Sequence, residues 1–237
     1  MTMQPGALDH DHERPWADQE WTQFQRVQRM VNHWDRPGWT PGRRSYHWMV
    51  MLGHVPALTA MATHCQEQLR DLPHLDLVPI ASLHITMQRL AFTDEVSPDV
   101  AAAVVNEVRR RCADLPAVPI EIGPLAGSPG AVRFSVGPPE PVSRLRNLIC
   151  GSIAEVCGNA ALPERASRFV PHVSIAYHNT TANAQPLIQR VASLRHLRPV
   201  TTVVQSVDLV ELRREGHQYI ASKHAGVSLT NGPLQHR

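Results

Sequence analysis

The sequence lacks a strong charge of either sign, a long apolar run and a leader-like N-terminus. Its 23 Lys and Arg residues nearly balance its 21 Asp and Glu residues, which leaves a formal net charge of +2. So small a balance predicts no broad basic surface for long nucleic acids, so that any anion site must be local. No run of about 18 apolar residues occurs, and no basic stretch followed by an apolar segment opens the chain. We therefore expect a cytoplasmic protein without a membrane segment.

Cysteine and metal-ligand patterns are also absent. The four cysteines, Cys65, Cys112, Cys150 and Cys157, form no C-x-x-C pair, which favours reduced, buried thiols over disulfides. Histidine is abundant, with 14 residues, but no H-E-x-x-H or equivalent spacing is present. The sequence therefore predicts no metal site and no cofactor, and it disfavours zinc-dependent hydrolysis.

Two short stretches repeat one pattern, in which a histidine and a small hydroxyl residue are separated by a single spacer. They read HITM at His84 to Met87 and HVSI at His172 to Ile175. Each lies in a short apolar run that is typical of a buried strand. Because side chains alternate faces along a strand, His84 and Thr86 point the same way, as do His172 and Ser174. The two copies are too far apart for a hairpin, and their separation fits two half-domains that share one cleft.

Two facing imidazoles can perform acid–base chemistry on a phosphodiester without a metal ion. One takes a proton from the attacking hydroxyl or water, and the other gives a proton to the leaving oxygen. Thr86 and Ser174 can donate hydrogen bonds to the non-bridging phosphate oxygens. The same alternation places Gln88 on the cleft face, where it can hold a phosphate oxygen or a sugar hydroxyl, and places Arg89 and Tyr177 on the opposite face.

Further substrate-binding candidates lie on two other predicted strands. Tyr46 and Trp48 share one face of the strand over 46–52, and aromatic rings of this kind stack on bases or sugars. Arg133, on the strand over 132–136, can bind a phosphate through two hydrogen bonds. Structural roles remain open for these residues, with Trp48 filling the core and Arg133 a solvated strand residue.

The order of the predicted elements indicates an α+β fold with internal duplication. Each half holds a helix, a histidine strand and another helix, so we expect two antiparallel or mixed sheets that face each other across a central cleft with helices outside. Residues 1–15 are predicted to be a mobile tail, residues 16–45 an aromatic helix and a loop, and residues 46–230 the two-lobed domain. The helix is predicted from Trp16 to Trp34, with an aromatic stripe that either covers the core or stacks a nucleobase.

The two motifs resemble the signatures of the 2H phosphoesterase superfamily, specifically its LigT-like group of 2′-5′ RNA ligases and cyclic phosphodiesterases. The resemblance covers residues 44–228 and implies a bilobal fold, metal-independent chemistry and substrates with 2′,3′-cyclic, 1″,2″-cyclic or 2′–5′-linked phosphates. It implies that His84 and His172 form the acid–base pair and that Thr86 and Ser174 position the phosphate. Many members continue the first motif with an arginine where this chain has Gln88.

The leading hypothesis is a monomeric phosphodiesterase that hydrolyses a cyclic or 2′–5′-linked phosphodiester of a nucleotide or an RNA end. A reversible 2′-5′ RNA ligase is an alternative, because the same two histidines serve whether water or a 5′-hydroxyl attacks. A non-catalytic nucleotide-binding module is a third possibility, but a pure binder has no need of both imidazoles. The sequence leaves open which histidine is the acid and which the base.

Overall fold

The computed structural model describes residues 14–158 and 169–230. The elements follow one another as α1 (Pro15–Gln25), β1 (Arg29–Met30), β2 (Arg44–Met51), α2 (Pro56–Leu69), β3 (Leu75–Leu77), the 3₁₀ helix η1 (Ile80–Ser82), β4 (His84–Phe92), α3 (Pro98–Arg111), β5 (Val118–Ser128), β6 (Ala131–Gly137), α4 (Pro139–Cys157), β7 (His172–His178), β8 (Ala182–Asn183), α5 (Gln185–Leu194), β9 (Val200–Val204), β10 (Ser206–Arg214) and β11 (Tyr219–Ser228). The predicted α+β class is confirmed.

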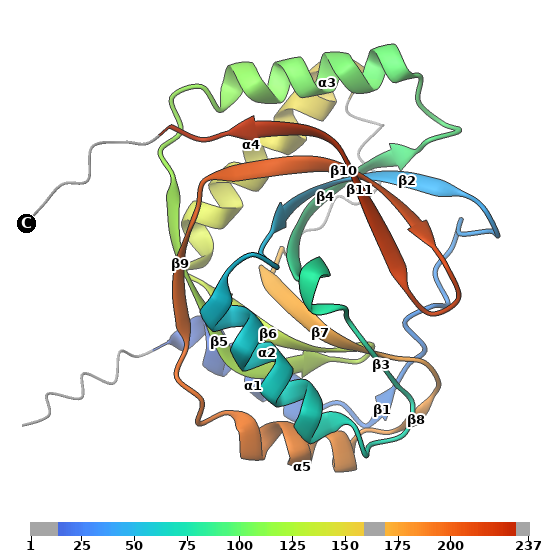
Figure 1. Ribbon diagram of the computed structural model, residues 1–237, viewed down its shortest axis with the longest axis vertical. Helices are drawn as coiled ribbons and strands as arrows, with labels where there is room; N and C mark the ends of the chain where they lie inside the picture. The colour runs from blue at the N-terminus through green and yellow to red at the C-terminus, as the bar shows by residue number, and fades with distance from the viewer. Residues whose placement is uncertain (1–13, 159–168, 231–237) are drawn as a thin grey trace, which may run out of the picture.

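Two antiparallel sheets carry the two histidine strands. One has the strand order β11-β10-β2-β4, and the other has the order β3-β7-β6-β5-β9. β4 therefore lies at an edge of the first sheet, and β7 lies inside the second sheet between β3 and β6. Figure 1 shows both sheets in the middle of the molecule, with α3 crossing the top of the view and α5 the bottom.

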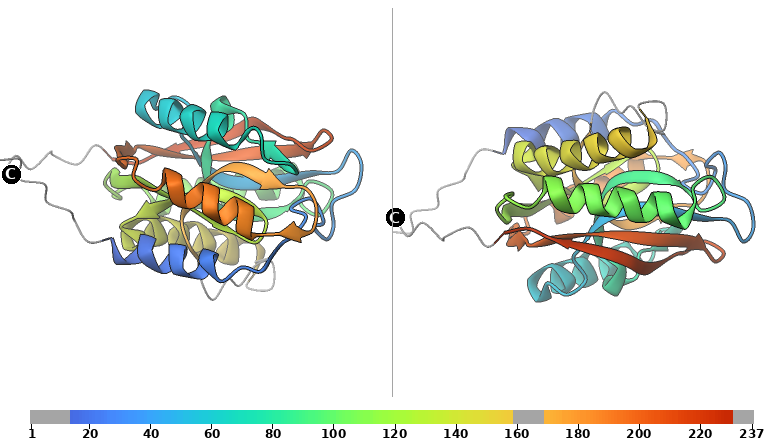
Figure 2. Two further views of the ribbon diagram at one scale, coloured as in Figure 1. Left: turned by 90° about the horizontal axis from the view of Figure 1, so that it is seen from below. Right: turned by 90° about the horizontal axis from the view of Figure 1, so that it is seen from above.

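The helices cover the sheets from several sides. α4 packs against both β4 and β6, so it contacts both lobes, and α3 packs on α4 and β11. α1 packs on β5 and β6, and α2 lies near η1, β7 and α5. Figure 2 shows α2 on one side of the molecule and α1 with α4 on the opposite side. None of the helices in the described ranges is long and apolar enough to cross a membrane.

Local sequence signals explain where several elements begin and how β4 is approached. In α3 the Ser97 side chain accepts a hydrogen bond from the Val100 N–H at 3.3 Å, and Pro98 occupies the first turn. Gly53 follows β2 and lies so close to the Ala81 backbone that a Cβ atom has no room there. This close approach holds η1 against the end of β2, immediately before His84.

The N-terminal helix differs from the prediction, because α1 ends at Gln25 and not near Trp34. The chain after the helix pairs with distant strands instead: β1 pairs with β8, and the His33 N–H donates to the His178 carbonyl oxygen at 2.7 Å. Tertiary hydrogen bonds therefore override the helical spacing of the apolar residues. Phe24 of α1 packs on Gly127 of β5. The part of the aromatic stripe that lies on α1 therefore covers the core, which was one of the two roles predicted for it; the other was to stack on a nucleobase.

Candidate active site

A cleft of about 590 Å³ lies between the two sheets. β4 contributes His84 and Thr86 to its wall, and β7 contributes His172 and Ser174, so the structure brings the two predicted motifs together. The remaining lining residues come from the 31–39 segment, the strands β2, β4, β6, β7 and β10, the helix α4, the segment before β7 and the start of β11: His33, Arg36, Pro37, Trp39, His47, Met49, Met87, Gln88, Arg89, Arg133, Arg146, Phe169, Val170, Tyr177, Leu212 and Tyr219.

The two histidines are held in the same way. His84 Nδ1 lies 2.7 Å from the Ser82 carbonyl oxygen, and His172 Nδ1 lies 2.8 Å from the Val170 carbonyl oxygen. A carbonyl oxygen only accepts, so Nδ1 carries the proton in both rings and Nε2 is the nitrogen left for a ligand. In each case the acceptor is the backbone carbonyl two residues before the histidine, so an equivalent contact orients both imidazoles.

Burial lowers the pKa of both imidazoles, but the two environments differ. The pKa of His84 is lowered by desolvation, which the hydrogen bond to Ser82 partly offsets. The pKa of His172 falls further, to about 3, because desolvation is joined by the positive charge of nearby Arg133 and weaker repulsion from a protonated His84. His172 is therefore held neutral more strongly than His84.

Each histidine strand contains a β-bulge at the last residue of its motif. In β4, Trp48 pairs with Gln88 but Met49 pairs with Thr86, so Met87 is the extra residue. The bulge reverses the alternation of side chains that follow it. Arg89 therefore lies in the cleft wall with His84, against the sequence-based expectation that placed it on the opposite face.

The bulge in β7 has the same effect. Arg133 of β6 pairs with Ser174, whereas Val132 pairs with Ala176, which leaves Ile175 as the extra residue. Tyr177 consequently lines the cleft, again against the prediction from strict alternation. The fifth residue after the histidine thus enters the cleft in both lobes.

An ion pair anchors the arginine beside Ser174. Arg133 lies 3.1 Å from a carboxylate oxygen of Glu20 on α1, and both side chains are largely buried. Burial raises the pKa of Glu20, and the positive charge of Arg133 is the largest effect that opposes this rise. The N-terminal helix α1 therefore fixes the position of a cleft side chain through Glu20. Arg133 lines the cleft and is not the solvated strand residue that the sequence left open.

Gln88 is among the residues that line the cleft, but it follows the bulge and pairs with the buried Trp48, and its side-chain amide is bonded to protein partners. The Gln88 carbonyl oxygen accepts a hydrogen bond from Arg146 at 2.8 Å, and the amide nitrogen donates to the Arg89 carbonyl oxygen at 3.1 Å. Arg146 also donates from Nε to the Met87 carbonyl oxygen at 3.0 Å, at the bulge. Gln88 and Arg146 thus hold the bulged strand in place.

The prediction that Tyr46 and Trp48 face a substrate is wrong. Trp48 is fully buried in the hydrophobic core, Tyr46 is nearly so, and neither lines the cleft. The alternate residues of β2, His47 and Met49, face the cleft instead. The aromatic rings of β2 pack in the core, so the face of the strand that we predicted to line the cleft is the buried face. For Trp48 this is the core-filling role that the sequence left open.

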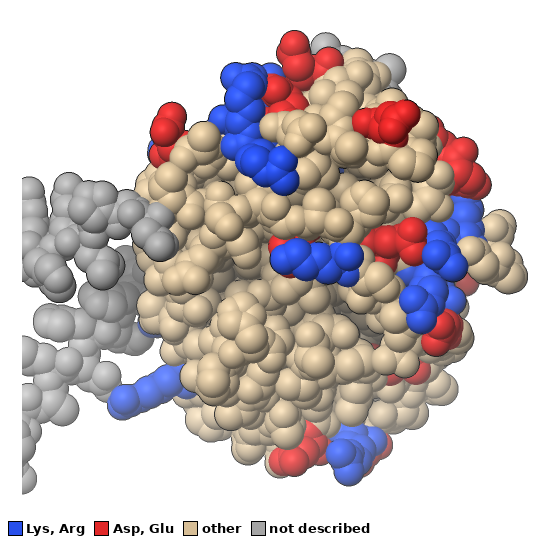
Figure 3. Space-filling model, turned by 45° about the horizontal axis from the view of Figure 1, so that its top comes forward, with Lys and Arg blue, Asp and Glu red and all other residues tan. Residues whose placement is uncertain are grey.

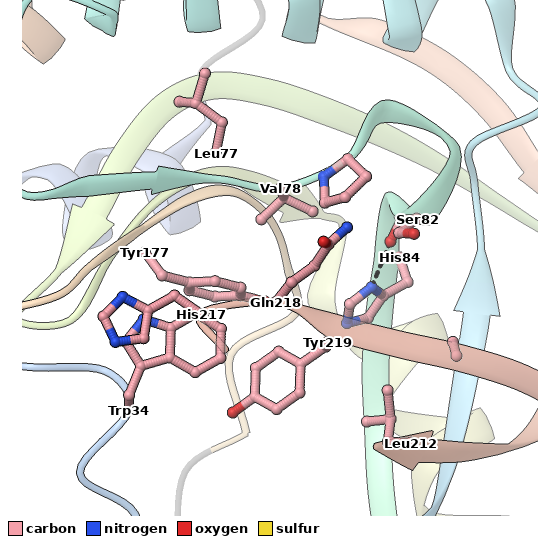
Figure 4. A pocket seen from close by; sticks show the side chains of 12 residues that line it. Trp34, Leu77, Val78, Ser82, His84, Tyr177, Leu212, His217, Gln218 and Tyr219 are labelled. Carbon is pink, nitrogen blue, oxygen red and sulfur yellow. Dashed lines mark hydrogen bonds between the residues drawn. The ribbon is translucent and has the colours of Figure 1, made fainter. Parts of the chain in front are cut away.

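Aromatic side chains gather at one end of the cleft. Tyr177 stacks on His33 with ring centroids 3.8 Å apart, and Tyr219 lies edge-on to both rings. Figure 4 shows Tyr219 and Gln218 beside the His84 ring, and the Trp34 ring against that of His217 next to Tyr177. The residues from the 31–39 segment and from β11 had no motif that distinguished them in the sequence.

Metal-binding groups are not clustered in the part of the chain that the structure describes: no three His, Cys, Asp or Glu residues lie close enough to hold an ion. Among the described residues that line the cleft there is also no carboxylate, whereas four arginines are present. The cleft is thus suited to an anionic ligand, with histidines and hydroxyls at its centre.

Comparison with known proteins agrees with this geometry. The sequence model of the 2′-5′ RNA ligase superfamily matches residues 56–216. The chain belongs to this superfamily. The match leaves out α1, β1 and β2, and so it leaves out Glu20, His33 and His47. No curated protein sequence is detectably similar to the chain.

Solved structures of this superfamily's fold are similar over most of the chain. The Thermus thermophilus protein TT0787 is 18% identical with a TM-score of 0.62, and the match covers 80% of this chain and 99% of that one. Escherichia coli LigT complexed with 3′-AMP is 13% identical with a TM-score of 0.60, and the match covers 79% and 99% of the two chains. LigT complexed with NADP⁺ is 13% identical, with a TM-score of 0.58 and coverage of 79% and 98%. These likenesses show the fold.

Proposed function

We propose that this protein is a phosphodiesterase that hydrolyses a cyclic or 2′–5′-linked phosphodiester of a nucleotide or an RNA end without a metal ion. One observation carries the proposal: both His-x-hydroxyl motifs line one cleft, and each histidine keeps Nδ1 bonded to a backbone carbonyl, which leaves Nε2 for the substrate. Membership of the superfamily and the nucleotide complexes of LigT support the substrate class.

In the proposed reaction His172 is the general base and His84 the general acid. His172 takes a proton from water at Nε2, because Arg133 and burial keep this ring neutral. The water oxygen forms a bond to phosphorus, and the bond from phosphorus to the leaving sugar oxygen breaks. A protonated His84 gives its Nε2 proton to that oxygen, and the negative substrate favours the protonated form of His84.

The hydroxyls and the arginine stabilise the charge that develops on the phosphoryl oxygens. Thr86 and Ser174 lie on opposite walls and donate to the non-bridging oxygens, where each preorganised donor is typically worth about 10²- to 10³-fold in kcat. Arg133 lies beside Ser174 across the β6–β7 pair and adds a positive charge at the same place. The arrangement therefore favours a phosphorane-like transition state over the ground-state diester.

The distribution of charge favours a small nucleotide or the end of an RNA over a long strand. On the face drawn in Figure 3, Lys and Arg side chains are interspersed with Asp and Glu side chains and do not form one basic patch. Four arginines, by contrast, line the cleft. Binding of a long strand requires many phosphate contacts along the surface.

The test is turnover of 2′,3′-cyclic AMP and of a short RNA with a 2′,3′-cyclic end, in EDTA, by the wild type, His84→Ala and His172→Ala. We expect hydrolysis by the wild type and a loss of about 10²- to 10⁴-fold in each variant. Activity that disappears with EDTA, or that survives either substitution, contradicts the proposal. Joining of the cyclic end to a 5′-hydroxyl RNA supports the ligase alternative, and binding without turnover supports the non-catalytic module.

A further inference from the structure

One of the four histidines that line the cleft has no hydrogen-bond partner among the described residues. Both ring nitrogens of His47 on β2 are buried, and neither has a partner in the described part of the chain. A buried polar group left without a hydrogen-bond partner is energetically unfavourable, and native structures contain few of them. Because His47 lines the cleft, a ligand in the cleft is the partner that removes this cost.

Arg89 stands directly opposite His47. The two residues are register partners across β2 and β4, and both line the cleft, so their Cβ atoms lie about 5 Å apart on one face. The Arg89 Nε is also buried without a hydrogen-bond partner. Its guanidinium lies 5.1 Å from the Phe92 ring centroid, and no carboxylate among the described residues pairs with it.

Arg36 adds a second cation to the same region. Its Nε donates to the His33 carbonyl oxygen at 3.3 Å, which holds the side chain at the cleft, and it too has no carboxylate partner in the described ranges. The charges of Arg89 and Arg36 both act on His47, whose pKa burial and these charges lower to about 3. Two cations and two unused imidazole nitrogens therefore lie together, with no carboxylate beside them among the described residues.

The place of this group along the strand sets its distance from the reacting phosphate. Thr86, which we propose holds that phosphate, pairs with Met49, two residues from His47 on β2. With a rise of about 3.4 Å per residue, the His47–Arg89 pair lies roughly 7 Å along the strand from Thr86. That is about the span of a single sugar, the distance between neighbouring phosphates of a nucleotide.

We propose that His47, Arg89 and Arg36 form a second anion subsite, and that the substrate carries a second phosphate one sugar away from the diester that reacts between His84 and His172. The inference rests on the proposed function for the position of the reacting phosphate. It specifies the substrate class as a nucleotide with two phosphate groups, such as an RNA end, and disfavours a mononucleotide with a single cyclic phosphate.

The subsite can be tested by binding, independently of turnover. The dissociation constants of 2′-AMP and of adenosine 2′,5′-bisphosphate are measured by calorimetry at a fixed, physiological salt concentration. We expect the wild type to bind the bisphosphate about 10- to 100-fold more tightly, which corresponds to hydrogen bonds with a charged group. In Arg89→Gln and His47→Leu we expect this preference to shrink to about threefold or less, with the affinity for 2′-AMP nearly unchanged.

Arg44→Gln is the matched control, because Arg44 lies on the same strand β2 but pairs with Glu211 on the surface at 2.9 Å. This variant loses the same charge and is expected to keep the preference. Thermal unfolding shows whether His47→Leu or Arg89→Gln is misfolded. If one of them is, the other still tests the subsite. Arg89→Lys, which keeps the charge without the planar fork, is expected to give an intermediate preference.

Three results overturn the proposal: equal affinity of the wild type for both ligands, an equal loss of both affinities in Arg89→Gln, or a preference that neither substitution changes. Turnover of the cyclic substrates is measured in parallel on the same wild-type sample. If the binding preference follows His47 and Arg89 but no cyclic phosphate is hydrolysed, the proposed function fails while the second subsite stands.

Discussion

The histidine strands β4 and β7 share the same arrangement of histidine, hydroxyl residue and bulge, but they differ in the residue that follows the bulge into the cleft. In each, the histidine is oriented by a carbonyl two residues earlier, the hydroxyl residue follows two positions later, and a bulge turns the fifth residue after the histidine into the cleft. That fifth residue is Arg89 in β4 and Tyr177 in β7. The first wall therefore ends in a cation and the second in an aromatic ring.

The strand beside each motif differs as well. Met49 stands next to Thr86, whereas Arg133 stands next to Ser174 and is paired with Glu20. The β7 wall thus has its positive charge beside Ser174, whereas the β4 wall has Arg89 further along the strand from Thr86. Two walls with equal motifs are therefore electrostatically unequal, and this inequality is the basis for assigning different roles to the two histidines.

The largest effect is expected where the two walls are alike. Thr86→Val and Ser174→Ala each remove one hydroxyl donor, and we expect each to lower kcat on a 2′,3′-cyclic substrate by about 10²- to 10³-fold. Steady-state kinetics of both variants measure this. A large loss of kcat in only one variant means that a single hydroxyl binds the phosphate, and it contradicts equivalent roles for Thr86 and Ser174.

The Glu20–Arg133 ion pair under the β7 wall predicts an effect on stability. Glu20→Gln leaves the buried Arg133 without its counter-charge, and we expect a loss of about 3 kcal/mol in the free energy of unfolding. Denaturant unfolding measures it. The double variant Glu20→Gln/Arg133→Gln removes both charges and should recover much of the loss, and a single variant as stable as the wild type contradicts a structural role for the pair.

The inequality of the histidines predicts a selective change in the pH profile. Removing the positive charge of Arg133 raises the pKa of His172, and a base must be deprotonated to act, so the ascending limb of kcat/KM should move to higher pH. The Glu20→Gln/Arg133→Gln variant is suitable, and the descending limb, assigned to His84, should stay in place. Movement of the descending limb instead reverses the assignment of acid and base.

The smallest effect is expected at the aromatic end of β7. Burial raises the pKa of Tyr177 and the nearby Ser174 side chain opposes this rise, so Tyr177→Phe removes a polar neighbour of Ser174 and keeps the ring that stacks on His33. We expect kcat to fall about threefold, the usual worth of one neutral hydrogen bond. A loss as large as that of Ser174→Ala would show that the Tyr177 hydroxyl itself contacts the substrate.

The sequence was sufficient for the fold class and for the cleft position of the four motif residues, because apolar strands and a period of two are local properties. It was insufficient for Arg89 and Tyr177, which enter the cleft because of β-bulges. The position of a bulge depends on how a strand pairs with its neighbour and cannot be read from the alternation of apolar and polar residues in one strand. For Arg146 a signal was present: it interrupts the apolar stripe of α4 that Val142 and Ile149 define.

The errors at the N-terminus have a similar physical cause. The apolar spacing from Trp16 onward continues past Gln25, but hydrogen bonds of the later residues to distant strands end the helix there. On β2 the alternation itself was correct, and only the choice of face was wrong, because Trp48 gains more from full burial than from a place in the cleft. The polar residue His47 lies on the opposite face of β2 from Tyr46 and Trp48, and it was the feature of the sequence that could have identified the cleft face.

The kcat values of His84→Ala, His172→Ala and the double variant, measured in EDTA, test whether His84 and His172 act as one acid–base unit across the cleft. If the two proton transfers belong to one step, the double variant should be about as slow as the slower single variant. A loss in the double variant equal to the product of the two single losses would show that the histidines act independently and would contradict the account.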